Sequence, residues 1–138
     1  MIAYVDSSVL LRVVLGQPGR LKEWKTIERG VASALVEVEC LRTLDRLRLK
    51  ASLQDEELAR RRAAVYRISE ELELVQPGPA VLRRATQPLP TPVGTLDAIH
   101  LATALLWQES RGRDILMATH DHGLARAARA SGLHVIGG

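Results

Sequence analysis

Residues 96–106 read LDAIHLATALL, a run of apolar and small residues at helical spacing with one carboxylate, Asp97, in its first turn. At 100° per residue, Asp97 shares a stripe with His100, Leu101 and Ala104. These small and apolar neighbours predict that Asp97 points inward or into a cleft rather than into open solvent. Its role depends on three other acids that are distant in the sequence.

The length of 138 residues favours one domain that covers the whole chain, 1–138, with one hydrophobic core. Hydrophobic residues make up 46% and charged residues 25%, which is typical of a soluble globular protein. No apolar run approaches the roughly 18 residues that span a membrane. The apolar run at the N-terminus is interrupted by Asp6 and has no basic segment before it, so we expect no signal peptide. With a single cysteine, Cys40, we expect a cytoplasmic protein.

The net charge of +3 and the isoelectric point of about 9.5 are compatible with a nucleic-acid partner. Arginine outnumbers lysine 16 to 3, which suits phosphate recognition, although genome base composition would explain the bias as well. The chain has no phenylalanine, two tryptophans and two tyrosines. A base-stacking platform is therefore not expected, and nucleic acid would be contacted mainly through phosphates.

Short apolar runs alternate with amphipathic segments along the chain, which indicates a parallel sheet covered by helices on both faces. A proline-rich loop, QPLPTPVG, precedes the helix quoted above, and residues 20–29 carry apolar side chains at helical spacing. Ser7 or Ser8 is expected to cap the first helix. We predict strands at 2–5, 31–34, 72–75, 115–118 and 134–136, and helices at 9–15, 35–50, 55–70, 80–86, 95–109 and 123–130.

Four acids fall where a site is expected in such a sheet, beyond the carboxyl ends of the strands. Asp6 and Asp121 follow strands, Glu39 lies in the first turns of the helix after the second strand, and Asp97 begins its own helix. Taken singly, each acid has a simpler explanation, such as a helix cap, a surface partner of Arg42 or a favourable charge at a helix start. Their common edge favours a shared site.

Two glutamates compete for the second position of this set. Glu39 lies on a polar stripe with Arg42, whereas Glu37 falls on the apolar side of the same helix. That apolar side also carries Val36, Cys40, Leu44 and Leu47.

Clustered carboxylates require a counter-charge, because two of them about 5 Å apart repel by roughly 3 kcal/mol at an effective dielectric of about 20. Either some of them take up protons or a cation resolves the conflict. Oxygen-only ligands select hard ions such as Mg²⁺ or Mn²⁺. Such an ion acidifies water and neutralises phosphate charge, so this acidic edge in a basic protein indicates phosphodiester hydrolysis.

Four segments stand in a fixed order along the chain: DSS (6–8), SALVEVECLR (33–42), LDAIHLATA (96–104) and THDHGLARAA (119–128). In this order they resemble the PIN-domain ribonucleases, and in character they are closest to VapC-type toxins of toxin–antitoxin pairs. The resemblance spans residues 2–136, and its most specific part is LDAIHLATA. It implies an α/β fold, a PIN-like α/β/α sandwich with a central parallel sheet of about five short strands.

The resemblance implies a metal-dependent endoribonuclease that uses Mg²⁺ or Mn²⁺ and is neutralised by a cognate antitoxin. It also implies an RNA substrate and a homodimer. The catalytic and metal-binding acids would be Asp6, Glu39, Asp97 and Asp121.

The same resemblance implies supporting roles for three polar residues. Thr119, two residues before the last acid, would orient a carboxylate or a water, and Ser7 would act similarly. Arg42 would pair with Glu39 or touch phosphate. Glu39 is preferred to Glu37 because the family's acid falls six residues after a serine such as Ser33 and just before a Leu-Arg pair.

Two further classes of protein were compared with this hypothesis. One is a catalytically silent PIN-like module that binds RNA or protein, against which the intact set of four acids argues. The other is a receiver-like domain, which needs an acidic pair near its first strand and a lysine after a late strand. Asp6 stands alone, and no lysine follows Lys50, so this class fits poorly.

Other polar clusters have structural explanations. The run His120-Asp121-His122 suggests zinc, but three adjacent residues rarely converge on one ion and no cysteine pair joins them. His100 is interpreted as a packed or rim histidine, and residues 60–62, all arginine, as a solvated helix face.

Overall fold

A five-stranded, entirely parallel β-sheet forms the centre of the protein, in the order β3-β2-β1-β4-β5. The computed structural model describes residues 1–50 and 52–138. This sheet confirms the expected α/β/α sandwich, and its order differs from the 2-1-3-4-5 order of receiver-like domains. The strands are β1 (Ile2–Val5), β2 (Arg29–Ser33), β3 (Glu73–Val75), β4 (Leu116–Ala118) and β5 (Val135–Ile136).

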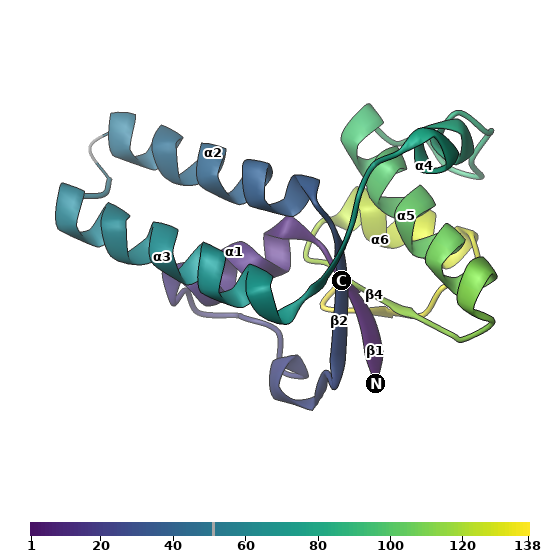
Figure 1. Ribbon diagram of the computed structural model, residues 1–138, viewed down its shortest axis with the longest axis horizontal. Helices are drawn as coiled ribbons and strands as arrows, with labels where there is room; N and C mark the ends of the chain where they lie inside the picture. Colours follow the sequence, from purple (N-terminus) through teal and green to yellow (C-terminus); the bar gives the residue numbers. More distant parts are fainter. Residues whose placement is uncertain (51) are drawn as a thin grey trace.

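Helices cover both faces of the sheet, as Figure 1 shows. On one side lie α1 (Ser7–Leu15), α2 (Leu35–Leu49) and α3 (Asp55–Glu71). On the other side lie α5 (Thr95–Arg111) and α6 (His122–Ala130), and α4 (Pro79–Ala85) packs against α5. No helix in the described chain is both long enough and apolar enough to cross a membrane.

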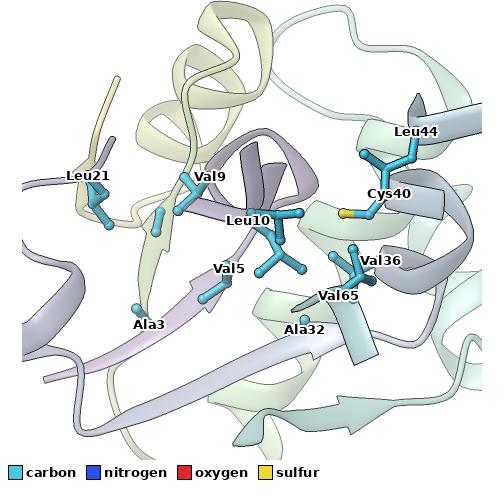
Figure 2. Close-up of a cluster of buried hydrophobic side chains, with 12 residues drawn as sticks. Ala3, Val5, Val9, Leu10, Leu21, Ala32, Val36, Cys40, Leu44 and Val65 are labelled. Atoms are coloured by element: carbon cyan, nitrogen blue, oxygen red, sulfur yellow. The ribbon is translucent and has the colours of Figure 1, made fainter. Parts of the chain in front are cut away.

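Alternating side chains of the strands feed two separate hydrophobic cores. Val5 and Ala32 point toward α1, α2 and α3, where they meet a cluster that includes Cys40 (Figure 2). Tyr4 and Val31 point to the opposite face and pack with residues of α5 and α6. Both faces of β1 are therefore buried, so the side chain of Tyr4 lies inside the protein, just before the acidic edge.

Strand β2 begins two residues earlier than predicted, because residues outside the apolar run join the sheet. Arg29 and Gly30 align with Ile2 and Ala3 of β1. A Cβ atom at Gly30 would lie 2.5 Å from Cδ2 of Leu72, so any larger residue would require the end of that side chain to shift. This constraint comes from a distant segment, so the local apolar pattern does not contain it.

The predicted N-cap of the first helix was wrong, and one helical pattern corresponds to no full helix. The helical spacing within residues 20–29 produces only a short 3-10 helix, η1 (Trp24–Thr26), because Leu21 is buried against the core from a loop. Asp6 rather than Ser7 or Ser8 occupies the N-cap position of α1, since Ser7 is already helical, and the Asp6 side chain makes no cap hydrogen bond. The carbonyl of Asp6 accepts the first helical bonds, from the backbone N–H groups of Val9 and Leu10. The remaining expected elements are present, with ends shifted by one or two residues.

Candidate active site

The four sequence-predicted acids are distributed over three segments of helix and one strand end, all at the carboxyl edge of the sheet. Asp6 follows β1 directly, and Asp121 is the N-cap residue of α6, just beyond β4. Glu39 lies in the second turn of α2, which follows β2, and Asp97 lies in the first turn of α5. Parallel strands place all these starting points at one edge.

Asp6 is the most firmly held of the acids. Its side chain is buried, with 4% of the residue exposed. Its Oδ2 accepts hydrogen bonds from Ser8 Oγ at 2.7 Å and from Thr119 Oγ1 at 2.9 Å. Its backbone N–H donates to the carbonyl of Ala118, which joins the ends of β1 and β4. The orientation of this carboxylate is therefore set by two strands and a helix start.

Thr119 connects Asp6 to Asp121. While its hydroxyl donates to Asp6, the same oxygen accepts from the backbone N–H of Asp121 at 3.0 Å. Oδ1 of Asp121 then accepts from the N–H of Leu124 at 2.9 Å and caps α6. Asp121 itself is exposed, so it lies on the open side of the edge. Thr119 therefore lies between two of the predicted acids, and its supporting role in the site remains a prediction.

Glu39 is held by a histidine that the sequence argument interpreted only as a packed or rim residue. Its Oε1 lies 2.6 Å from Nε2 of His100, a side chain with no exposed surface. Nδ1 of the same ring contacts the hydroxyl of Tyr4, which accepts a hydrogen bond from the N–H of Ser33 at 3.1 Å. The signal in the sequence was the position of His100 on the inward stripe of Asp97.

The pKa of Asp97 depends on the other charges at this edge of the sheet. Burial raises its pKa, and the negative charges of Asp121, Asp6 and Glu39 raise it further, against an opposing effect of His100. All three other acids therefore act on Asp97 through their charges. The structure brings the four predicted acids into one electrostatic cluster.

His100 responds to the same cluster. Burial alone would lower its pKa, but the hydrogen bond and charge of Glu39, with the charges of Asp6 and Asp97, outweigh burial. The pKa of this imidazole is therefore raised above its ordinary value. Burial also raises the pKa of the Tyr4 phenol far beyond its usual range, so that hydroxyl keeps its proton.

The other predicted residues lie around this cluster. Ser7 and Arg42 line a shallow pocket together with Glu39. Of the two neighbouring serines, Ser8 rather than Ser7 donates its hydroxyl to Asp6, although Ser8 was expected only as a helix cap. Arg42 pairs with Asp45 at 3.2 Å and leaves Glu39 to His100. The roles proposed for Ser7 and Arg42 remain predictions.

The donor set of the cluster fits a hard divalent cation. It offers carboxylate oxygens without a thiolate, and the neighbouring imidazole is turned toward Glu39. Within residues 1–50 and 52–138, Asp6, Glu39 and Asp121 each use one oxygen in a hydrogen bond and keep the other out of such bonds. No three His, Cys, Asp or Glu side chains of that part stand close enough to hold a metal ion as they are.

Comparison with known proteins identifies the family. A family model described as "PIN domain" matches residues 3–130, and the chain belongs to this family. Ribonuclease VapC46 of Mycobacterium tuberculosis is 34% identical over 136 residues, which cover 96% of this chain and 95% of that protein. The expected likeness to VapC-type PIN domains is confirmed.

Solved structures have the same fold at low sequence identity. A toxin–antitoxin complex from Klebsiella pneumoniae contains a chain with a TM-score of 0.68 and 13% identity, over 97% of this chain and 95% of that one. VapBC2 from Rickettsia felis, bound to a DNA fragment from its promoter, gives a TM-score of 0.64 and 12% identity, over 98% and 97% of the two chains. These likenesses support the PIN architecture along nearly the full length.

Proposed function

We propose that this protein is a VapC-type endoribonuclease toxin that hydrolyses RNA phosphodiester bonds with the help of Mg²⁺ or Mn²⁺. The observation that carries the proposal is the placement of Asp6, Glu39, Asp97 and Asp121 at the carboxyl edge of the sheet in a PIN-family chain. The raised pKa of Asp97, caused by burial and by the charges of Asp121, Asp6 and Glu39, supports it. Clustered carboxylates at the carboxyl edge of a parallel sheet repel one another, and a bound cation relieves this repulsion. Its relative Ribonuclease VapC46 carries the activity in its name.

The acids would hold the cation through the oxygens that they keep free of protein hydrogen bonds. Asp6 presents one such oxygen while Ser8 and Thr119 fix the other. Glu39 is fixed in the same way by His100. When bound, the cation supplies positive charge for the phosphate and acidifies a nearby water.

The chain's own residues would orient the substrate around this centre. Arg42 and Arg46 line the pocket beside Glu39, where their charges suit the phosphates flanking the cleaved bond. Leu35, Val38 and Leu96 add apolar surface to the same pocket, and no aromatic side chain lines it. This lining supports contact through phosphates and sugars rather than through stacked bases.

The test compares two glutamates in one helix. The full chain and its Glu39→Gln and Glu37→Gln variants would be incubated with a mixture of structured RNAs, with Mn²⁺ or with EDTA. We expect Mn²⁺-dependent cleavage by the parent protein, a loss of at least a hundredfold for Glu39→Gln, and near-parental cleavage for Glu37→Gln. Loss in Glu37→Gln alone would show that the acid was misassigned. Cleavage that persists in EDTA would refute the metal requirement.

The proposal extends to partners. One solved structure with the same fold is a toxin–antitoxin complex. We expect a small antitoxin to bind this protein and block its acidic edge, and we expect the protein to act in the cytoplasm as a homodimer. Expression with and without the protein encoded beside it would test the pairing through growth arrest and RNA breakdown. Light scattering on the purified chain would test the dimer. Growth unaffected by expression alone would argue for the silent, RNA- or protein-binding alternative.

A further inference from the structure

We propose that His100 and Tyr4 are positioning residues that hold Glu39 in place through a buried chain of hydrogen bonds. The inference rests on the proposed function, because it concerns a carboxylate assigned to the metal. Among the described residues, the bond from His100 is the one that restrains the Glu39 carboxylate. Asp6, by comparison, is held by two hydroxyl groups.

This chain of hydrogen bonds runs through the interior of the protein from the sheet to α2. It begins at the backbone N–H of Ser33, the last residue of β2, passes through Tyr4 of β1 and His100 of α5, and ends at Glu39. Both ring-bearing side chains have no exposed surface. Burying such polar groups costs several kcal/mol unless they are hydrogen-bonded, so their mutual contacts offset a real penalty.

The direction of the protons follows from the first link. Because the Tyr4 oxygen accepts from the N–H of Ser33, its own proton is available for Nδ1 of His100. Nε2 then carries the ring proton and donates it to Glu39. In a doubly protonated ring Nε2 also carries a proton, so the donation to Glu39 is present in either state.

Such a donor determines which oxygen of Glu39 remains for a cation. Oε1 points back to the buried ring, and the residue is partly exposed, with 21% of its side chain accessible. The second oxygen is therefore the one presented at the edge. Outer partners of this kind typically contribute about 10- to 100-fold in metal affinity.

Two variants of His100 distinguish a role in positioning Glu39 from a role in packing the core. In His100→Gln the amide nitrogen stands as many bonds from Cβ as Nε2 does, so it can still donate to Glu39. In His100→Asn the amide reaches only as far as Nδ1. Both variants lose the ring and part of its packing. A role in packing alone predicts equal effects.

The first measurement is the affinity for Mn²⁺. It is determined from the electron paramagnetic resonance signal of free Mn²⁺ during titration of the full-length protein. We expect His100→Asn to weaken Mn²⁺ binding about tenfold or more. His100→Gln should retain most of the affinity. In a Glu39→Gln background, His100→Asn should add little further loss. Equal losses in the Gln and Asn variants, or additive losses with Glu39→Gln, would overturn the proposal.

The second measurement needs no metal and no RNA. Nitrogen-15 spectra of the imidazole groups should show a proton on Nε2 of His100, and both Tyr4→Phe and Glu39→Gln should shift the His100 signals. A ring without a proton on Nε2, or one insensitive to both substitutions, would overturn the proposal even if the Asn variant fails to fold. If the spectra fit but the parent protein binds no Mn²⁺ or cuts no RNA, the proposed function fails and the buried chain remains.

Discussion

Ionised Asp97 is destabilised by the neighbouring acids in the metal-free protein. Burial and the charges of Asp121, Asp6 and Glu39 raise its pKa. A carboxylate about 8 Å away repels by about 2 kcal/mol before salt screening, whereas a charge in the first turn of a helix gains about 0.3–1 kcal/mol. We therefore expect Asp97→Asn to stabilise the protein by about 1 kcal/mol in urea unfolding at pH 7 with EDTA.

The pH dependence of this effect has a defined sign. A carboxyl group with a raised pKa in the folded state contributes stability below its unfolded pKa, near pH 4, and loses it as the pH rises through the folded value. The advantage of Asp97→Asn over the parent protein should therefore grow from about pH 4 to pH 7. A difference that is constant over this range would contradict the assignment.

Cys40 gives a second prediction at the scale of one residue. It is fully buried in the core shared by α1, α2 and α3, and burial, with the charges of Glu39 and Asp6, raises the pKa of its thiol to about 12. A buried thiol that keeps its proton is a poor nucleophile. We expect no reaction with a disulfide reagent in the native protein and rapid reaction in urea. Fast native labelling would show that this core opens readily.

Strand β2 shows how one element depends on another. A Cβ at Gly30 would lie 2.5 Å from Cδ2 of Leu72, in the residue that precedes β3. Gly30→Ala requires the end of the half-buried Leu72 side chain to shift, so we expect it to destabilise the protein by about 1–2 kcal/mol, in the lower part of the range for overpacking. Thermal unfolding of the full chain would measure it.

The control substitution lies at another glycine. A Cβ at Gly78, next to α4, meets nothing within 4 Å, and Gly78→Ala should change stability by less than about 1 kcal/mol. Shortening Leu72 to Ala in the Gly30→Ala background should recover part of the loss beyond the cost of Leu72→Ala alone. Independent, additive effects of the two substitutions would exclude the proposed clash.

These elements also show what the sequence alone could predict. Helical and alternating patterns located every strand and major helix, because burial against a neighbour leaves a local periodicity. The start of β2 was missed, since Gly30 joins the sheet through its alignment with β1 and its contact with Leu72. The helical spacing that includes Leu21 does not correspond to a full helix, because a loop, rather than a helix, buries that side chain.

At the scale of the whole molecule, the acids were predictable and their supports were not. The rule for parallel sheets placed Asp6 and Asp97 at one edge without any knowledge of strand order. The partners of these acids follow from contacts between distant segments. Ser8 was mistaken for a helix cap, and the link from Tyr4 to His100 joins residues 96 positions apart. No local pattern encodes such a pair.

A divalent cation at this edge should stabilise the entire fold. Glu39 belongs to a helix on one face of the sheet, Asp97 and Asp121 are associated with helices on the other, and Asp6 ends the central strand. One ion would therefore connect both layers and relieve repulsion in the folded state only. At a Mn²⁺ concentration of about 100 times its dissociation constant, linkage gives about 2.7 kcal/mol.

For a chain of this length, that free energy corresponds to a rise of about 8 °C in Tm, measured by calorimetry. Sodium chloride at equal ionic strength is the control, since screening weakens repulsion without connecting the layers. Asp97→Asn should lose most of the Mn²⁺ effect, and Glu37→Gln, which removes a carboxylate outside the proposed set of four, should keep it. An equal rise in Tm with sodium chloride would mean that the acids repel one another but do not bind a divalent cation together.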